Sequence, residues 1–179
     1  FSADQWKALG TAALRGLSAH QLEGLTPDQI AALGTAQLNV LTSAQLGGLN
    51  ASWLDSLQAS QLAGLGSAQL AAFGTAALAG LDLDQIAALG SRQVLGLSSN
   101  QIAALSVDQV AALSTAAIRG LRTELISALS ADQLGALGTR QIAALSTRQI
   151  AALDTSEIMA LSTQQVHALS SAQLSALST

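Results

Sequence analysis

Histidine is the residue of this chain most suited to acid–base or metal chemistry near neutral pH. The two copies, His20 and His167, lie near opposite ends of the 179 residues, and there is no cysteine. A metal or catalytic pair would need both imidazoles at one place. The chain is an unbranched array of eight-residue repeats, and such an array keeps its distant repeats apart. We therefore expect exposed surface histidines and no metal site.

The carboxylates could do acid–base work only where two of them lie close together. Asp82 with Asp84 and Asp154 with Glu157 are the closest such pairs. The first member of each pair stands at an expected helix N-cap and the second in the first turn, where the helix dipole stabilises negative charge. No Ser-His-Asp set or glycine-rich phosphate loop accompanies them. We expect neither an enzyme nor a cofactor.

The most regular polar feature is a glutamine that returns every eight residues. It belongs to a repeat that runs from Ser2 to Leu177 without insertion or deletion, with the consensus [G/S]-[T/S/A]-x-Q-[L/I/V]-x-[A/G]-L. This predicts one array of 22 octapeptide repeats over residues 2–177, with Phe1 and residues 178–179 as partial flanking repeats. Because the chain begins and stops inside this pattern, we expect a segment of a longer or processed protein.

Each repeat carries signals for the start of a helix. Position 1 is Ser, Gly, Thr, Asp or Asn in all but two repeats, and the glutamine at position 4 completes a capping box with it. Pro27 falls at position 2, where a missing N–H is harmless. A glutamine ladder that caps helices and bonds Gln to Gln between coils is expected, with an exposed, ligand-facing row as the alternative; its members include Gln29, Gln37, Gln45, Gln85, Gln101, Gln109, Gln133, Gln141 and Gln149.

The other positions define the packing faces of that helix. Positions 5 and 8 are large and apolar and share one side, position 7 is Ala or Gly in nearly every repeat, and positions 3 and 6 vary as exposed positions do. A continuous helix would carry the leucines around its axis by about 80° per repeat, and a β-solenoid is disfavoured by Ala and Gln. The prediction is an all-α solenoid of helices of about five to seven residues, one per repeat.

The number of repeats per coil is less clear from the pattern. Glycine alternates at position 7 with a period of sixteen residues, at Gly48, Gly64, Gly80 and Gly96. That alternation favours two repeats per coil, with three as the alternative. At roughly 8–10 Å per coil, the array would be on the order of 100 Å long with two repeats and 65 Å with three.

Two repeats depart most strongly from the consensus, with a large apolar residue at the glutamine position. Trp53 replaces the glutamine in one, and Leu125 replaces it in the other, where Arg122 also takes the cap position. If position 4 is partly exposed, Trp53 and Leu125 are candidates for a lateral contact with a partner. If it is buried, they are packing variants, which is the interpretation we favour.

The charge and hydropathy pattern narrows the possible partners. A formal charge of −4 with only seven Lys and Arg gives no basic face for nucleic acid. Polar residues interrupt every repeat, so no apolar run is long enough to span a membrane. We therefore expect neither nucleic-acid binding nor a membrane-spanning segment.

Repeats such as GTRQIAAL, STRQIAAL and SVDQVAAL resemble the S-T-x-Q-[I/V]-x-A-L octapeptide arrays of very large bacterial surface or secreted proteins, often labelled adhesin-like. The resemblance covers essentially the whole chain. It implies an extracellular or cell-surface location and a structural role. We expect a stalk, spacer or self-associating filament segment, joined end to end or laterally; the alternative is an adhesin-type solenoid that binds a protein or glycan through its lateral surface.

Overall fold

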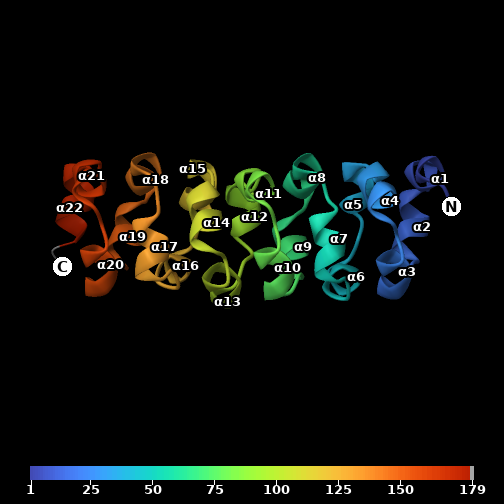
Figure 1. The fold of residues 1–179 in the computed structure, drawn as a ribbon, viewed down its shortest axis with the longest axis horizontal. Helices are drawn as coiled ribbons and strands as arrows, with labels where there is room; N and C mark the ends of the chain where they lie inside the picture. Colours follow the sequence, from blue (N-terminus) through green and yellow to red (C-terminus); the bar gives the residue numbers. More distant parts are fainter. Residues whose placement is uncertain (178–179) are drawn as a thin grey trace.

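A computed structural model describes residues 1–177, and the predicted partial repeat at 178–179 lies outside the described residues. The described chain is a rod of 22 short helices, with its two termini at opposite ends (Figure 1). Each helix begins at position 2 of its repeat and contains four to six residues, slightly fewer than expected. The all-α solenoid with one helix per octapeptide is thus confirmed.

Three repeats, not two, form each coil. Every pair of helices in substantial contact is separated by three in the chain order, as in α1 with α4 and α12 with α15. The helices therefore form three rows along the rod, which we name face 1, face 2 and face 3 after the first helix of each. The preferred prediction of two repeats per coil is wrong, and the alternative of three holds.

The bounds of the helices follow this order. Face 1 contains α1 (Ala3–Ala8), α4 (Pro27–Ala32), α7 (Ala51–Asp55), α10 (Thr75–Ala79), α13 (Ser99–Ala103), α16 (Thr123–Ile126), α19 (Thr147–Ala151) and α22 (Ser171–Ala176). Face 2 contains α2 (Thr11–Arg15), α5 (Thr35–Leu38), α8 (Ala59–Gly64), α11 (Leu83–Ala87), α14 (Val107–Ala112), α17 (Ala131–Gly135) and α20 (Thr155–Met159). Face 3 contains α3 (Ala19–Glu23), α6 (Ser43–Gly47), α9 (Ser67–Ala71), α12 (Ser91–Val94), α15 (Thr115–Gly120), α18 (Thr139–Ala144) and α21 (Thr163–His167).

The capping pattern explains why helices so short can form. The residue at position 1 is the N-cap of every helix, with an extended backbone that lets the chain turn between helices. Where that residue is Ser, Thr or Asp and position 4 is Gln or Glu, both hydrogen bonds of the capping box are present, as in Ser2 with Gln5. The prediction of a helix start in every repeat is confirmed, and stacking supplies the stability that the isolated helices lack.

The core is one continuous layer along the axis of the rod. It contains the side chains of positions 5 and 8 from nearly every repeat, from Leu14 to Leu169. Position 3 is exposed in every repeat, and position 6 in all but three. Each row of helices also winds about the long axis, because α8 and α11 lie along the upper edge of Figure 1 while α20 of the same face lies along the lower edge.

The small residue at position 7 allows successive coils to approach closely. A Cβ added to Gly96 would lie 2.4 Å from the Ser67 carbonyl oxygen, and one added to Gly120 would lie 2.4 Å from the Ser91 Cα. In both cases the neighbour is the first residue of the helix one coil earlier. Because Gly80 meets only carbonyls of its own helix, the sixteen-residue alternation of glycine does not report the size of the coil.

Replacing Gly96 with alanine should therefore push two coils apart. We expect Gly96→Ala to lower the free energy of unfolding by about 1–2 kcal/mol, the cost of overpacking against backbone atoms. The matched variant Gly80→Ala has its nearest contact at 3.4 Å and should be neutral or slightly stabilising, since alanine favours helices. Urea unfolding followed by circular dichroism measures both. Equal midpoints for the two variants would contradict the close approach.

Candidate functional site

The site with the most repeated polar geometry is the glutamine ladder at position 4. All nine glutamines proposed for it accept a hydrogen bond at Oε1 from the N–H of their own N-cap residue. Eight of the nine are buried, and Gln29 in the second coil is half-buried. A buried amide cannot face a ligand in solvent, so the ladder is an internal one.

The other end of each amide reaches into the preceding coil. The Nε2 group of Gln141 donates to the carbonyl of Leu113 at 2.6 Å and to that of Ala111 at 3.1 Å. The bond to the carbonyl 28 residues earlier occurs throughout, for example from Gln45 to Leu17 and from Gln109 to Leu81. These acceptors are carbonyls at helix C-termini, which have no partner within their helix. The expected Gln–Gln bonding is wrong, because the partner of each amide nitrogen is the backbone.

Each glutamine thus joins the beginning of one helix to the end of a helix in the coil before. The amide is complementary to this task because one atom accepts while the other donates. Desolvation makes each bond hard to lose, since the freed carbonyl and N–H would stay buried. In the first described coil Gln5 and Gln21 are exposed, because the described residues include no earlier coil to cover them.

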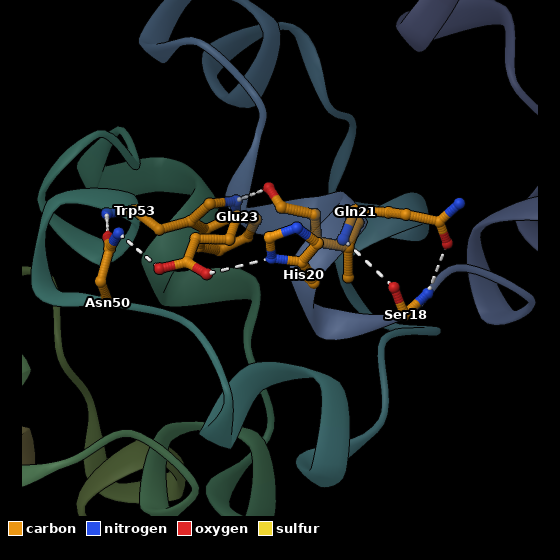
Figure 2. A network of polar contacts seen from close by, with 7 residues as sticks. Ser18, His20, Gln21, Glu23, Asn50 and Trp53 are labelled. Carbon is orange, nitrogen blue, oxygen red and sulfur yellow. Dashed lines mark hydrogen bonds and ion pairs between the residues drawn. The ribbon is translucent and has the colours of Figure 1, made fainter.

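Trp53 keeps a bond to the coil before, with a different donor and with an acceptor 31 rather than 28 residues earlier. Its indole Nε1 donates to the Leu22 carbonyl at 3.0 Å, and its ring, only 2% exposed, stacks on Phe73 with the centroids 6.5 Å apart. In Figure 2 the ring lies beside a polar chain in which Asn50 caps the Trp53 N–H and donates to Glu23. Trp53 is a packing variant, and the hypothesis of a lateral contact through it is wrong.

Leu125 is also buried, which removes it as a lateral contact. In its repeat the carbonyl of Leu97 accepts from the Arg122 guanidinium at 2.9 Å, and Arg122 is the residue that replaced the usual cap. In the repeat with Ala117, the Ser114 hydroxyl donates to the Leu89 carbonyl at 2.8 Å. Each acceptor lies 28 residues before the position where glutamine is missing. In each of these two repeats, the cap residue therefore forms the bond that the glutamine would have formed.

In two interior repeats of the described chain, neither position 4 nor the cap residue donates to the coil before. Ala77 has an apolar side chain, and Glu157 offers only carboxylate oxygens when it is ionised. One Glu157 oxygen accepts from the Asp154 N–H at 2.7 Å, as a glutamine would. Burial raises the pKa of the Glu157 carboxyl and the nearby Asp154 carboxylate raises it further, whereas the hydrogen bond from the backbone lowers it.

Both histidines are exposed on the surface, as expected. His20 in α3 and His167 in α21 are at opposite ends of the rod (Figure 1). The His20 side chain is 96% exposed, with Nδ1 3.9 Å from a Glu23 oxygen. Such an exposed pair contributes little to stability. No group of three or more potential metal ligands occurs in residues 1–177, and none of the helices there is long and apolar enough to cross a membrane.

Comparison with known families agrees with the repeat geometry. The ALTTAQ repeat matches residues 3–35, 54–91, 62–99, 87–115, 108–139, 134–163 and 142–179. The chain belongs to the ALTTAQ repeat family. The letters of that name follow positions 7, 8, 1, 2, 3 and 4 of the octapeptide, and Ala32 to Gln37 differ from them only at Gly34. No curated protein matches the chain.

The ALTTAQ chain is accordingly a repeat protein that builds a structural scaffold. The six positions in the family name include the small packing residue, the core leucine, the N-cap and the bridging glutamine. Sequence reasoning identified the capping half of the glutamine's role. It missed the bridging half, whose signal is that Arg122 replaces the cap in the repeat where glutamine is lost.

Proposed function

We propose that this ALTTAQ segment is a rod-like spacer or stalk of an exported bacterial protein, located outside the cell or on its surface. The observation that carries the proposal is the glutamine bridge, which connects successive coils in most repeats between Gln29 and Gln173. A bridge repeated at this pitch gives a length proportional to the number of repeats. The location rests on the resemblance to octapeptide arrays of bacterial surface proteins.

The sides of the rod support a structural rather than a catalytic role. The described titratable groups form no cluster within the core, and their exposed members are distributed over 22 repeats. We propose that the segment is not an enzyme. A spacer needs only solubility along its sides and stiffness along its axis, and both follow from the exposed positions 3 and 6 and the buried ladder.

The last coil supports end-to-end association as an extension of the same role. Val166 and Leu174 are 39% and 43% exposed, although position 5 is buried in the interior coils, because the described residues include no later coil. A further coil would bury both, whether it came from the same chain or from a second copy. Burial of apolar surface favours such stacking at roughly 25 cal/mol per Å².

Small-angle X-ray scattering tests the spacer. Seven coils at roughly 8–10 Å each should give a rod about 60–70 Å long with a radius of gyration of about 19–21 Å, whereas a compact domain of this length has about 16 Å. Deleting one coil, residues 98–121, should shorten the rod by about 8–10 Å and leave its cross-section unchanged. A radius of gyration near that of the compact domain, or a changed cross-section, would reject the rod.

An adhesin-type role is the second proposal, in which a protein or glycan binds the lateral surface. Its support is that the variable residues at position 3 are not distributed evenly among the three faces. Asp84, Asp108 and Asp132 all belong to face 2. A binding surface needs such a local difference, whereas a plain spacer does not.

A further inference from the structure

The three-repeat coil segregates charge in a way that the octapeptide pattern hides. In the repeats that contain α11, α14, α17 and α20 of face 2, all the charged residues are acidic, and those that are exposed are Asp82, Asp84, Asp108, Asp132 and Asp154. Asp84, Asp108 and Asp132 occupy position 3 of successive coils. We call these three residues the aspartate row.

Face 3 has the opposite sign over the same length of the rod. Repeats 12, 15 and 18 contribute Arg92, Arg119 and Arg140, all exposed, and none of these repeats contains an acidic residue. We call these three residues the arginine row. In residues 1–177 no member of either row forms an ion pair within the chain, since the one ion pair there joins His20 to Glu23. Both rows are therefore free to meet charges of another molecule.

Exposed apolar side chains accompany both rows. Leu83 and Val107 are 50% and 42% exposed and directly precede Asp84 and Asp108. Leu95, 53% exposed, lies three residues after Arg92. These leucines and the valine stand at positions 2 and 6, where small or polar residues are common in this chain. Apolar groups that flank charges are typical of a surface that loses water on contact with a partner.

The spacing of the two rows is matched by construction. Consecutive members of each row come from consecutive coils, so both rows follow the same coil-to-coil distance, roughly 8–10 Å. Arg119 stands at position 6 rather than 3, a displacement of about 4.5 Å along its helix that a long arginine side chain spans. The aspartate row and the arginine row of one molecule therefore have the same spacing and opposite charge.

We propose that a second copy of this chain docks on the side of the rod, with the aspartate row of one copy against the arginine row of the other. This pairing deepens the proposed spacer role by giving the rods a lateral contact. The two rows lie on different faces, so each copy keeps one row free for a further copy, and the contact builds bundles rather than a closed dimer. Because the faces wind about the axis, two straight rods meet over only part of their length.

The strength of this contact should depend on salt. Exposed ion pairs are weak individually and are screened beyond about 10 Å at 0.1 M salt. Several pairs in register act together, as linked binding sites do. Association should therefore be measurable at low ionic strength and at least about tenfold weaker at 0.3 M salt.

Sedimentation velocity with charge-reversed variants tests the pairing. One variant carries Asp84→Lys, Asp108→Lys and Asp132→Lys, and the other carries Arg92→Glu, Arg119→Glu and Arg140→Glu. The wild-type chain should associate at 20 mM NaCl, and each variant alone should associate at least about tenfold more weakly, because its two faces then repel. An equimolar mixture of the variants should associate about as strongly as the wild type.

A third variant controls for added charge. Ser52→Lys, Ala76→Lys and Asn100→Lys place three lysines at exposed position 3 of successive coils on face 1, and this variant should associate as the wild type does. A wild-type chain that stays monomeric at 20 mM NaCl and millimolar concentration, or a mixture that fails to associate, overturns the pairing. Neither result would contradict the spacer role if X-ray scattering still shows a rod. Failure of the lateral pairing can therefore be distinguished from failure of the spacer proposal.

Discussion

Replacing Trp53 with alanine is expected to lower the free energy of unfolding by about 3–5 kcal/mol, the largest effect of any single change discussed for this chain. The side chain is 2% exposed and stacks on Phe73, so its removal leaves a cavity in the core. It also removes the indole donor to the Leu22 carbonyl, which then keeps only backbone donors such as the Leu25 N–H. Urea unfolding monitored by far-ultraviolet circular dichroism gives the difference.

Glutamine at the same position separates the two contributions. Trp53→Gln also loses the aromatic ring, but it can form the bridge that glutamine forms in the other coils, to the carbonyls of Leu22 and Leu25. We expect Trp53→Gln to be more stable than Trp53→Ala by about 1 kcal/mol, the net value of a hydrogen bond to the coil before. Equal stabilities of the two variants would show that ring packing alone holds this coil.

Local features of the fold could be predicted because each octapeptide encodes them within a few residues. The cap at Ser106, the glutamine at Gln109 and the core leucine at Leu113 specify a helix start, a capping box and a buried side chain from one eight-residue window. The exposed positions followed from their tolerance of Lys7, Glu23 and other charged residues. These signals depend on neighbours in sequence, which the sequence itself contains.

The size of the coil could not be read in the same way, because it depends on contacts between residues 28 to 31 positions apart. Gly48 and Gly64 suggested a sixteen-residue period, yet each packs against a helix three repeats earlier, near Ala19 and Thr35. The burial of the glutamines follows from the coil as well. From the sequence alone, a glutamine in most repeats could equally be a surface residue. Its burial depends on a carbonyl of the coil before, which accepts from its amide nitrogen.

The broken repeats show how the ladder constrains the sequence. Loss of glutamine at Leu125 coincides with Arg122, and loss at Ala117 coincides with Ser114, whose hydroxyl turns to the earlier coil. What is retained in these repeats is a donor to one carbonyl rather than a residue type. The charge segregation between faces 2 and 3 is a feature of the same kind, because it exists only in a period of three repeats.

In the interior repeat that contains Glu157, a charged side chain stands where most repeats have a donor to a carbonyl of the coil before. By register, the carbonyls of Ile126 and Leu129 face this side chain, as the equivalent carbonyls face Gln149 and Gln165. A carboxylate cannot donate to them, and its burial raises the pKa of the carboxyl. We expect Glu157→Gln to stabilise the array by about 2–3 kcal/mol at pH 7, because it replaces a desolvated charge by a donor with two available acceptors.

The effect should depend on pH with a defined sign. A carboxyl whose pKa is higher in the folded chain than in the unfolded one stabilises the fold below the ordinary value of about 4.3, and this contribution is lost as pH rises through the folded pKa. Protonated Glu157 can donate as glutamine does, so the advantage of Glu157→Gln should fall by at least about half between pH 7 and pH 4. Urea midpoints of both chains at the two pH values measure this difference.

A reversed substitution one coil earlier completes the comparison. Gln133 bridges to Leu105 on the same face as Glu157, so Gln133→Glu should destabilise the array at pH 7 and recover on acidification. A Glu157→Gln chain no more stable than the wild type at pH 7 would mean that the Leu129 carbonyl has another partner. If the gain in stability from Glu157→Gln did not change with pH, its cause would be the packing of the amide rather than the removal of a buried charge. The reason is that a protonated carboxyl can donate as glutamine does, whereas an ionised one cannot.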